Sequence, residues 1–276
     1  MNRNKILKLL TITTTALAVT NKTISILSNR NNCFNKNNYL NYESKFGNIK
    51  YRKSGTGTPI LLIHNLSTGD NINEWNYILD YLSNNHTVYS LNLLGCGNSD
   101  KSNVIYTNFM YVKLINDFIN EIICSKTDIV TSGTSNNIAL TTALYNSNII
   151  NNIIMVNPCE TPTTNFNLLG KIINLPIIGT FIYNCMFTKK YCFKNTENNF
   201  RLYEYMNTYY DSIHYKNGNS KFLYTSIIQR KTYINYQHTI QNIKNETFTY
   251  LDNTHLYPHI ETPEKVAKFI LENVYS

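Results

Sequence analysis

The sequence predicts an α/β fold, in which a mostly parallel sheet carries helices on both faces and a helical cap is inserted late in the chain. From Gly47 to Val156, short apolar runs that suit buried strands alternate with segments of helical spacing. Such alternation implies right-handed crossovers and a parallel sheet. Between Cys159 and about Ser226 the alternation stops, and apolar and aromatic helical pieces broken by proline and glycine take over. Such an insertion can roof a pocket.

The expected elements follow one another at ordinary spacings. Ile60–His64 is a continuous apolar run, as in a strand that is buried on both faces. The other expected strands are Asn48–Lys53, Thr87–Leu91, Asp128–Thr131, Ile149–Val156 and Phe248–Leu251. The expected helices are Glu74–Leu82, Tyr111–Ile123, Ile138–Tyr145 and Pro263–Val274, with Leu168–Ile173, Phe181–Phe187 and Tyr203–Tyr215 in the cap.

Two regions are expected: an N-terminal apolar segment and linker over 1–46, and the α/β domain over 47–276 with its cap at about 159–226. Met1–Lys8 is basic, and Leu9–Val19 is apolar but diluted by threonines. That run is short for a transmembrane helix. Three interpretations stay open: a signal peptide with Ala16-Leu17-Ala18 as its cleavage site, an amphipathic membrane anchor, or a plain helix over the fold. They correspond to secretion, membrane association or a cytoplasmic protein.

Composition narrows the function classes. The chain has 276 residues, 42% of them hydrophobic, and a net charge of +8. Its lysines and arginines are scattered, so no basic stripe indicates a nucleic-acid partner. The six cysteines form no C-x-x-C pair and no Cys/His ligand spacing, so no structural metal is expected and reduced thiols are the default.

The strand-to-helix connection after Asp128–Thr131 is the strongest candidate for chemistry. It has the strand, tight turn and helix order that a nucleophile elbow requires. Ser135 would be the nucleophile, placed at a helix N-terminus where backbone N–H groups favour a developing oxyanion. Gly133 fills the first glycine place of G-x-S-x-G, whereas Asn137 stands in the second. The alternative is a Ser/Thr-rich turn in which Ser135 caps the helix.

Four landmarks in order make the chain from Gly47 onward resemble the α/β-hydrolase fold family. The landmarks are His64-Asn65 after the first buried strand, Asn92-Leu93-Leu94-Gly95-Cys96-Gly97-Asn98-Ser99 after the next, the elbow Gly133-Thr134-Ser135, and the late segment Pro258-His259-Ile260-Glu261-Thr262-Pro263-Glu264. The resemblance departs from the family pattern at chemical positions, because Asn65 and Asn92 stand where the family usually has glycine and aspartate.

The resemblance implies roles for several residues. His255 is the candidate base, although it lies one place earlier than the family histidine, and Asp252 and Glu160 are the candidate acids. The N–H groups of Leu66 and Asn136 would form the oxyanion hole. One strand-helix unit before His255 is expected to be missing, which would displace the acid.

Two functional hypotheses follow. The first is a serine hydrolase that cleaves an ester, amide or thioester with an apolar part through Ser135. This hypothesis implies no metal and no organic cofactor. The second is a protein that keeps the fold and its cap without catalysis, as a binding protein or a membrane-associated scaffold. The expected partners are a small molecule with an apolar part and, through the N-terminal segment, a membrane surface.

Overall fold

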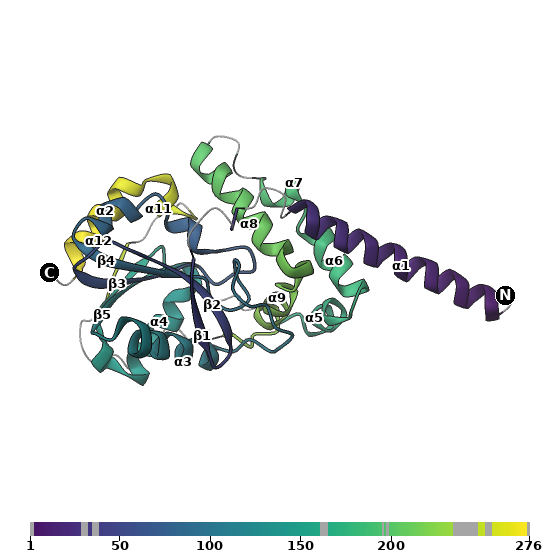
Figure 1. Ribbon diagram of the computed structural model, residues 1–276, viewed down its shortest axis with the longest axis horizontal. Helices are drawn as coiled ribbons and strands as arrows, with labels where there is room; N and C mark the ends of the chain where they lie inside the picture. The colour runs from purple at the N-terminus through teal and green to yellow at the C-terminus, as the bar shows by residue number, and fades with distance from the viewer. Residues whose placement is uncertain are drawn as a thin grey trace.

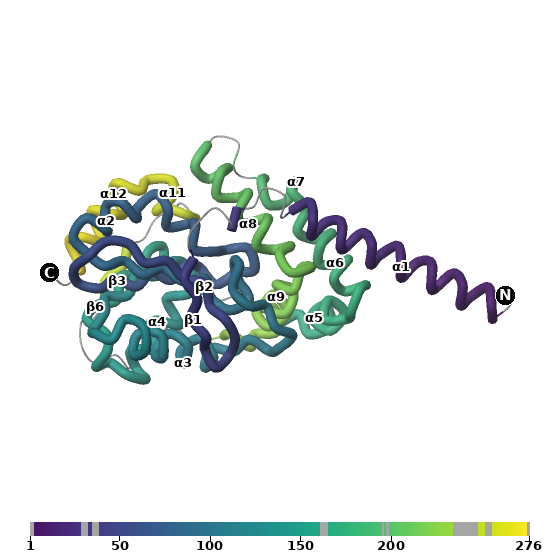
Figure 2. The backbone as a smooth tube through the Cα atoms, in the orientation of Figure 1, coloured from purple at the N-terminus to yellow at the C-terminus, as the bar shows by residue number. Residues whose placement is uncertain are grey.

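The computed structural model describes residues 3–28, 33–34, 39–160, 165–194, 196, 199–233, 248–251 and 256–274. The chain forms a sheet with helices on both of its faces, a group of further helices at one end, and a long N-terminal helix that projects from that end (Figure 1). The backbone trace shows the same arrangement (Figure 2).

The sheet has seven strands in the order β1-β2-β4-β3-β5-β6-β7. Its strands are β1 (Leu40–Ser44), β2 (Gly47–Ser54), β3 (Thr58–Ile63), β4 (His86–Leu91), β5 (Thr127–Ser132), β6 (Ile150–Val156) and β7 (Phe248–Leu251). The β1–β2 and β2–β4 pairs are antiparallel, and the others are parallel. The predicted α/β fold with a mostly parallel sheet is therefore confirmed.

Each face of the sheet has its own hydrophobic core. Because alternate residues of a strand point to opposite faces, Leu61 and Ile63 join the core under α3 and α4, whereas Ile60 and Leu62 join the core with Trp75. The flanking elements are η2 (Ile72–Trp75), α2 (Leu79–Ser83), α3 (Asn108–Phe118), the π-helical turn η3 (Ile119–Ile123), η4 (Gly133–Ser135), α4 (Asn136–Tyr145), η5 (Ser147–Ile149), α11 (Pro258–Glu261) and α12 (Pro263–Asn273).

A helical insertion separates β6 from β7. Its helices are α5 (Asn167–Asn174), α6 (Ile178–Met186), α7 (Lys189–Cys192), α8 (Phe200–Gly218) and α9 (Lys221–Ile228). The insertion packs on loops at the carboxyl ends of the strands: the Gly97 N–H donates to Ser212 Oγ at 2.9 Å, and the Tyr106 N–H donates to Ser226 Oγ at 3.0 Å.

The N-terminal segment is one long helix, α1 (Arg3–Ser28). Its second half packs on α6 and α8, whereas its first half extends beyond them (Figure 1). Within the described ranges, no single helix is long and apolar enough to cross a membrane; the bent pair α5–α6, with a 118° angle, meets the length and composition criteria jointly.

The structure departs from the predicted boundaries in two places. The sheet begins at Leu40, before the predicted domain start at Gly47, because β1 pairs with β2 across a tight turn. The predicted helix Glu74–Leu82 is instead two short elements, η2 and α2. After the insertion, the described residues contain one strand, β7, which pairs with β6 and precedes α11.

Candidate functional site

The turn after β5 places its strained residue at Gly133. Gly133 has φ +57°, a left-handed conformation that glycine adopts most easily. Ser135 instead has ordinary helical angles, with φ −67° and ψ −13°. In a nucleophile elbow, the nucleophile occupies the strained strand-to-helix turn. Gly133, which has no side chain to react, therefore has the backbone geometry of that position.

Ser135, the expected nucleophile, faces the interior of the protein. Its side chain is fully buried, and its hydroxyl donates to the His64 carbonyl oxygen at 2.5 Å. Ser135 ends the helical turn η4, and its side chain points toward the residue that follows β3. The hydroxyl therefore ties α4 to the end of β3.

The predicted donor Asn136 also faces inward. Its backbone N–H donates to Thr134 O inside the turn, and its side chain bonds Thr131 and Gly133. The N–H that follows the strained residue belongs to Thr134, which lines a pocket with the predicted donor residue Leu66. An oxyanion hole on this turn would therefore use Thr134 in place of Asn136.

The side chain of Asn65 fills the space at that N–H. Asn65 Oδ1 accepts hydrogen bonds from the Thr134 N–H at 2.9 Å and from Thr134 Oγ1 at 3.0 Å. A Cβ added to Gly133 would lie 2.3 Å from Asn65 Oδ1. Asn65 and a side chain at position 133 thus exclude one another.

A buried carboxylate fixes the orientation of Asn65. Asp70 Oδ2 accepts from Asn65 Nδ2 at 2.7 Å, so the amide oxygen of Asn65 must point toward Thr134. Asp70 also accepts from Ser67 Oγ at 2.7 Å, and from Tyr205 and Tyr257, each at 2.8 Å. Burial raises the pKa of Asp70, and the four hydrogen bonds oppose that rise. Asp70 therefore links the loop after β3 to α8 and to the segment before α11.

A second buried acid lies behind Asn65. Glu74 Oε1 accepts from the Asn65 N–H at 3.2 Å, and burial raises the pKa of Glu74 well above its usual value. His259 Nε2 lies 3.5 Å from the same oxygen without hydrogen-bond geometry. Burial lowers the pKa of His259 to about 3, and its ring packs on Trp75 at 4.5 Å between centroids. This histidine is neutral and packs in the core.

His64 is likewise held neutral. Its Nε2 accepts from the Leu93 N–H at 3.0 Å, so the proton is on Nδ1, which donates to Asn65 O at 2.7 Å. Burial lowers the pKa of His64 to about 4. His64 therefore organises the loops after β3 and β4.

A pocket of about 210 Å³ lies over Asn65 and Thr134. The insertion supplies Phe187, Tyr209, Tyr224 and Ile227. The remaining lining residues are Asn65, Leu66, Ser67, Thr68, Thr134, Cys159 and Thr232, so none of the described residues that line it is charged. We call this space the elbow pocket. It suits a small uncharged ligand with an apolar part.

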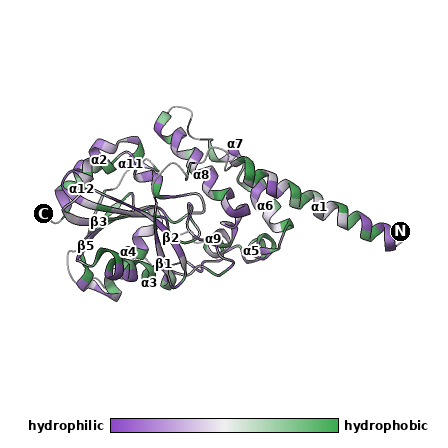
Figure 3. Ribbon diagram, in the orientation of Figure 1, coloured by the Kyte–Doolittle hydropathy of each residue, from purple (hydrophilic) through white to green (hydrophobic). Residues whose placement is uncertain are grey.

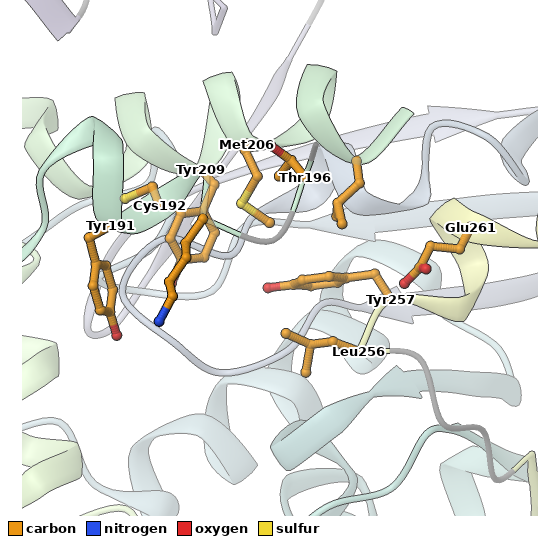
Figure 4. Close-up of a pocket in the computed structure, with 10 residues that line it drawn as sticks. Tyr191, Cys192, Thr196, Met206, Tyr209, Leu256, Tyr257 and Glu261 are labelled. Carbon is orange, nitrogen blue, oxygen red and sulfur yellow. The ribbon is translucent and has the colours of Figure 1, made fainter. Parts of the chain in front are cut away.

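A larger pocket, of about 520 Å³, lies on the other side of Tyr209. In Figure 4, Met206 and Tyr209 of α8 face Leu256 and Tyr257 across this space. It carries the charged residues Lys194 and Glu261. Tyr209 lines both pockets.

Of the remaining predicted site residues, only Glu160 lies in the described part of the chain. Glu160 is exposed and lines neither pocket. Asp252 and His255 lie outside the described residues. Among the residues that the structure does describe, no group of three His, Cys, Asp or Glu side chains could hold a metal ion.

Sequence reasoning missed the roles of Gly133 and Asn65. One signal was available: a glycine directly after a buried strand is the residue that best tolerates the strained turn position. If Gly133 occupies the nucleophile's place, Thr131 and Ser135 fall on the two glycine places of the motif. The contact between Asn65 and Thr134 joins residues far apart in sequence and left no signal.

Comparisons with known proteins agree with this fold. No family model matches the chain. An uncharacterized protein of Mycobacterium tuberculosis is 28% identical over 127 residues, which are 46% of this chain and 36% of that protein. The chain thus spans little more than a third of the length of that curated relative.

Two solved structures have the same fold. The epoxide hydrolase CorEH has a TM-score of 0.63 at 14% identity, over 85% of this chain and 97% of that one. A membrane phospholipase A described as a bacterial virulence factor also has a TM-score of 0.63 at 14% identity, over 99% of this chain and 98% of that one. An epoxide hydrolase and a phospholipase both hydrolyse their substrates, and at this identity the likeness of this chain to them shows the fold.

Proposed function

We propose that this chain, which has the α/β-hydrolase fold, is a ligand-binding protein, capped by its helical insertion, that does not hydrolyse what it binds. One observation carries this proposal. The Thr134 N–H donates to Asn65 Oδ1, and the strained turn residue next to Thr134 is the glycine Gly133. A substrate oxyanion would need that N–H. Neither a nucleophile nor its stabilising donor is available at the turn.

The elbow pocket supports a small, uncharged ligand. Its surface is mostly apolar. The polar residues among those that line it are uncharged: Asn65, Ser67, Thr68, Thr134, Thr232, Tyr209 and Tyr224. Uncharged donors and acceptors among apolar walls select a molecule with an apolar part and one or two polar groups. A charged ligand would lose its hydration without gaining an ion partner.

The first test measures binding to the elbow pocket. We expect 1-naphthol to bind the full-length protein and Ile227→Trp to weaken its affinity about tenfold or more, because the indole fills the pocket. The matched control is Ile105→Trp, since Ile105 is exposed and lines neither pocket. Titration by fluorescence gives the affinities. Equal affinities in the wild type and Ile227→Trp, or no binding at all, would overturn the binding proposal.

A serine hydrolase acting through Ser135 is the second candidate, because the solved neighbours are hydrolases. It requires the Ser135 hydroxyl to leave His64 O and reach a base. Labelling of the purified protein with a fluorophosphonate separates the two candidates. We expect no labelling and no turnover of 4-nitrophenyl butyrate. Labelling that Ser135→Ala abolishes would establish the hydrolase instead.

We also propose that the N-terminal segment contacts a membrane surface. The first half of α1 carries exposed apolar side chains, among them Leu9, Leu10 and Ile12. The match to the membrane phospholipase A covers 99% of this chain and therefore includes α1, whereas the match to the epoxide hydrolase covers 85%. The phospholipase neighbour is named as a membrane protein, which supports a membrane contact for this chain.

A further inference from the structure

We infer that the corner between α5 and α6 joins the outer half of α1 in one bilayer-contacting end of the molecule, and that this end selects anionic lipid. The inference rests on the proposed membrane contact of α1. It adds a second contacting element and a lipid class. We call the exposed apolar residues Phe166, Leu168, Leu175, Ile177 and Ile178 the α5–α6 corner.

The α5–α6 corner exposes large apolar side chains at a sharp bend. Leu168 is 72% exposed, Leu175 49% and Ile178 45%. α5 and α6 meet at 118° and together have the length and composition of a broken membrane segment. Isolated apolar residues are ordinary on protein surfaces, but a contiguous group marks a contact site.

The outer half of α1 exposes large apolar side chains among its basic residues and threonines. Leu7 is 52% exposed, Leu9 58% and Ile12 67%. A helix that combines exposed apolar residues with basic ones suits a membrane surface. The uncharged stretch between Lys8 and Lys22 would be about 20 Å long at 1.5 Å per residue, short of the roughly 30 Å hydrocarbon core. α1 is therefore better suited to lying at the surface of one leaflet, with Arg3, Lys5 and Lys8 at the headgroups, than to spanning the bilayer.

The threonines of α1 are compatible with an apolar environment. Thr11, Thr13 and Thr14 each donate a hydroxyl proton to the carbonyl four residues earlier, at 2.9 Å. Thr20 and Thr23 do the same. Because these donors are satisfied inside the helix, they need no water. The threonine content that dilutes the hydropathy of α1 thus carries little desolvation cost.

The two contacting elements are physically joined. Asn21 Nδ2 on α1 donates to the carbonyl of Ile177 in the corner at 2.9 Å. Figure 3 shows apolar residues on α1, α5 and α6 at the same end of the molecule. A bilayer that contacts the outer half of α1 would therefore also contact the α5–α6 corner.

The charge of these elements identifies the lipid. α1 and residues 165–194 together hold eight basic residues and no acidic one. Those residues are Arg3, Lys5, Lys8, Lys22, Lys171, Lys189, Lys190 and Lys194. The whole chain has 25 basic and 17 acidic residues, a net charge of +8, so the rest of the chain is neutral overall. Basic residues beside an apolar surface are attracted to anionic headgroups.

A bilayer against α1 and the α5–α6 corner would be a source of apolar ligands for the elbow pocket. Phe187 directly follows α6 and lines that pocket. A small molecule with an apolar part concentrates in a bilayer. The bilayer-contacting end therefore belongs to the same helical insertion that encloses the pocket.

Vesicle sedimentation with the full-length protein tests the inference. We expect it to sediment with vesicles of phosphatidylcholine and phosphatidylglycerol, to bind pure phosphatidylcholine vesicles about tenfold more weakly, and to be released by salt. Leu168→Asp with Ile178→Asp should lower binding to the anionic vesicles about tenfold or more, because each adds an acid to the contact. Phe109→Asp, on an exposed apolar residue of α3, is the control and should bind like the wild type.

Each other outcome overturns part of the inference. Equal binding of the corner variant and the wild type would remove the corner from the contact. Equal binding to both vesicle types would remove the lipid selectivity, and no binding would remove the whole inference. A corner variant that turns a dimer into a monomer in gel filtration would identify a second copy as the occupant. Unchanged 1-naphthol affinity in the corner variant verifies its fold, so failure here is distinct from failure of the pocket proposal.

Discussion

At the scale of residues, Asn65 and Gly133 depend on each other. Asn65 can reach Thr134 only because position 133 has no side chain, and a side chain at 133 would collide with Asn65 Oδ1. Asp70 holds the amide of Asn65 in this orientation. The pair therefore closes the site where an enzyme of this fold would place its nucleophile and its oxyanion.

A double-mutant cycle measures this dependence. We expect Gly133→Ser to destabilise the protein by about 3 kcal/mol, from the left-handed backbone and the collision with Asn65. In an Asn65→Ala background the loss should be smaller by about 1–3 kcal/mol. Urea unfolding supplies the free energies. The control pair is Gly133→Ser with Thr87→Ala, which should be additive because Thr87 bonds Gly57 O outside this hydrogen-bond network. Additive losses for Asn65→Ala would contradict the described packing.

At the scale of elements, α1 is fastened to the insertion by a buried polar contact. Asn21 donates to Ile177 O and accepts from Asn184 Nδ2 at 3.0 Å. Ser25 Oγ donates to His214 O at 3.0 Å. Since an unpaired buried polar group costs about 1–3 kcal/mol, this contact should decide whether α1 stays docked.

Limited proteolysis tests the docking of α1. Asn21→Ala should speed trypsin cleavage after Lys22 about tenfold, because its loss favours local undocking by roughly 1.4 kcal/mol. The urea midpoint of the sheet should stay near that of the wild type. Thr20→Ala, which removes an exposed bond within α1, is the matched control. Equal cleavage rates for Asn21→Ala and the wild type would show that Asn21 does not hold the helix.

At the scale of the whole molecule, stability depends on buried groups that resist ionisation. Burial lowers the pKa of His64 to about 4 and that of His259 to about 3. In the unfolded chain both would titrate near 6.5, so between that pH and the folded values the unfolded state binds more protons. Their contribution to stability therefore falls as pH decreases from about 6.5. Glu74 and Asp70, whose pKa values are raised, act in the opposite direction.

Replacing one histidine isolates its share of this pH dependence. His259→Phe keeps a ring on Trp75 and removes the titrating group. We expect the wild type to lose about 2 kcal/mol more than His259→Phe between pH 7 and pH 5, from 1.36 kcal/mol per pKa unit. Urea unfolding at several pH values gives the two profiles. Parallel profiles would show that His259 does not contribute.

The sequence predicted much of the fold because strands that are buried on both faces must be apolar. The runs Ile60–His64, Thr87–Leu91 and Ile149–Val156 have no other stable place than the centre of a sheet, and they correspond to β3, β4 and β6. β1 was missed because its alternating polar residues resemble a linker. The helix expected over Glu74–Leu82 divided into η2 and α2, since tertiary packing can override local helical spacing.

The sequence by itself determined the α/β fold, the position of the strand-to-helix turn and the helical insertion, because these follow from local periodicity and from glycine. Only the tertiary structure decided which residue of that turn faces the pocket. The strained residue of the turn is Gly133, whereas the predicted nucleophile Ser135 lies two residues later in η4 and is buried. The contact of Asn65 with Thr134 likewise depends on β3 lying beside β5, a pairing between distant segments that no local pattern encodes.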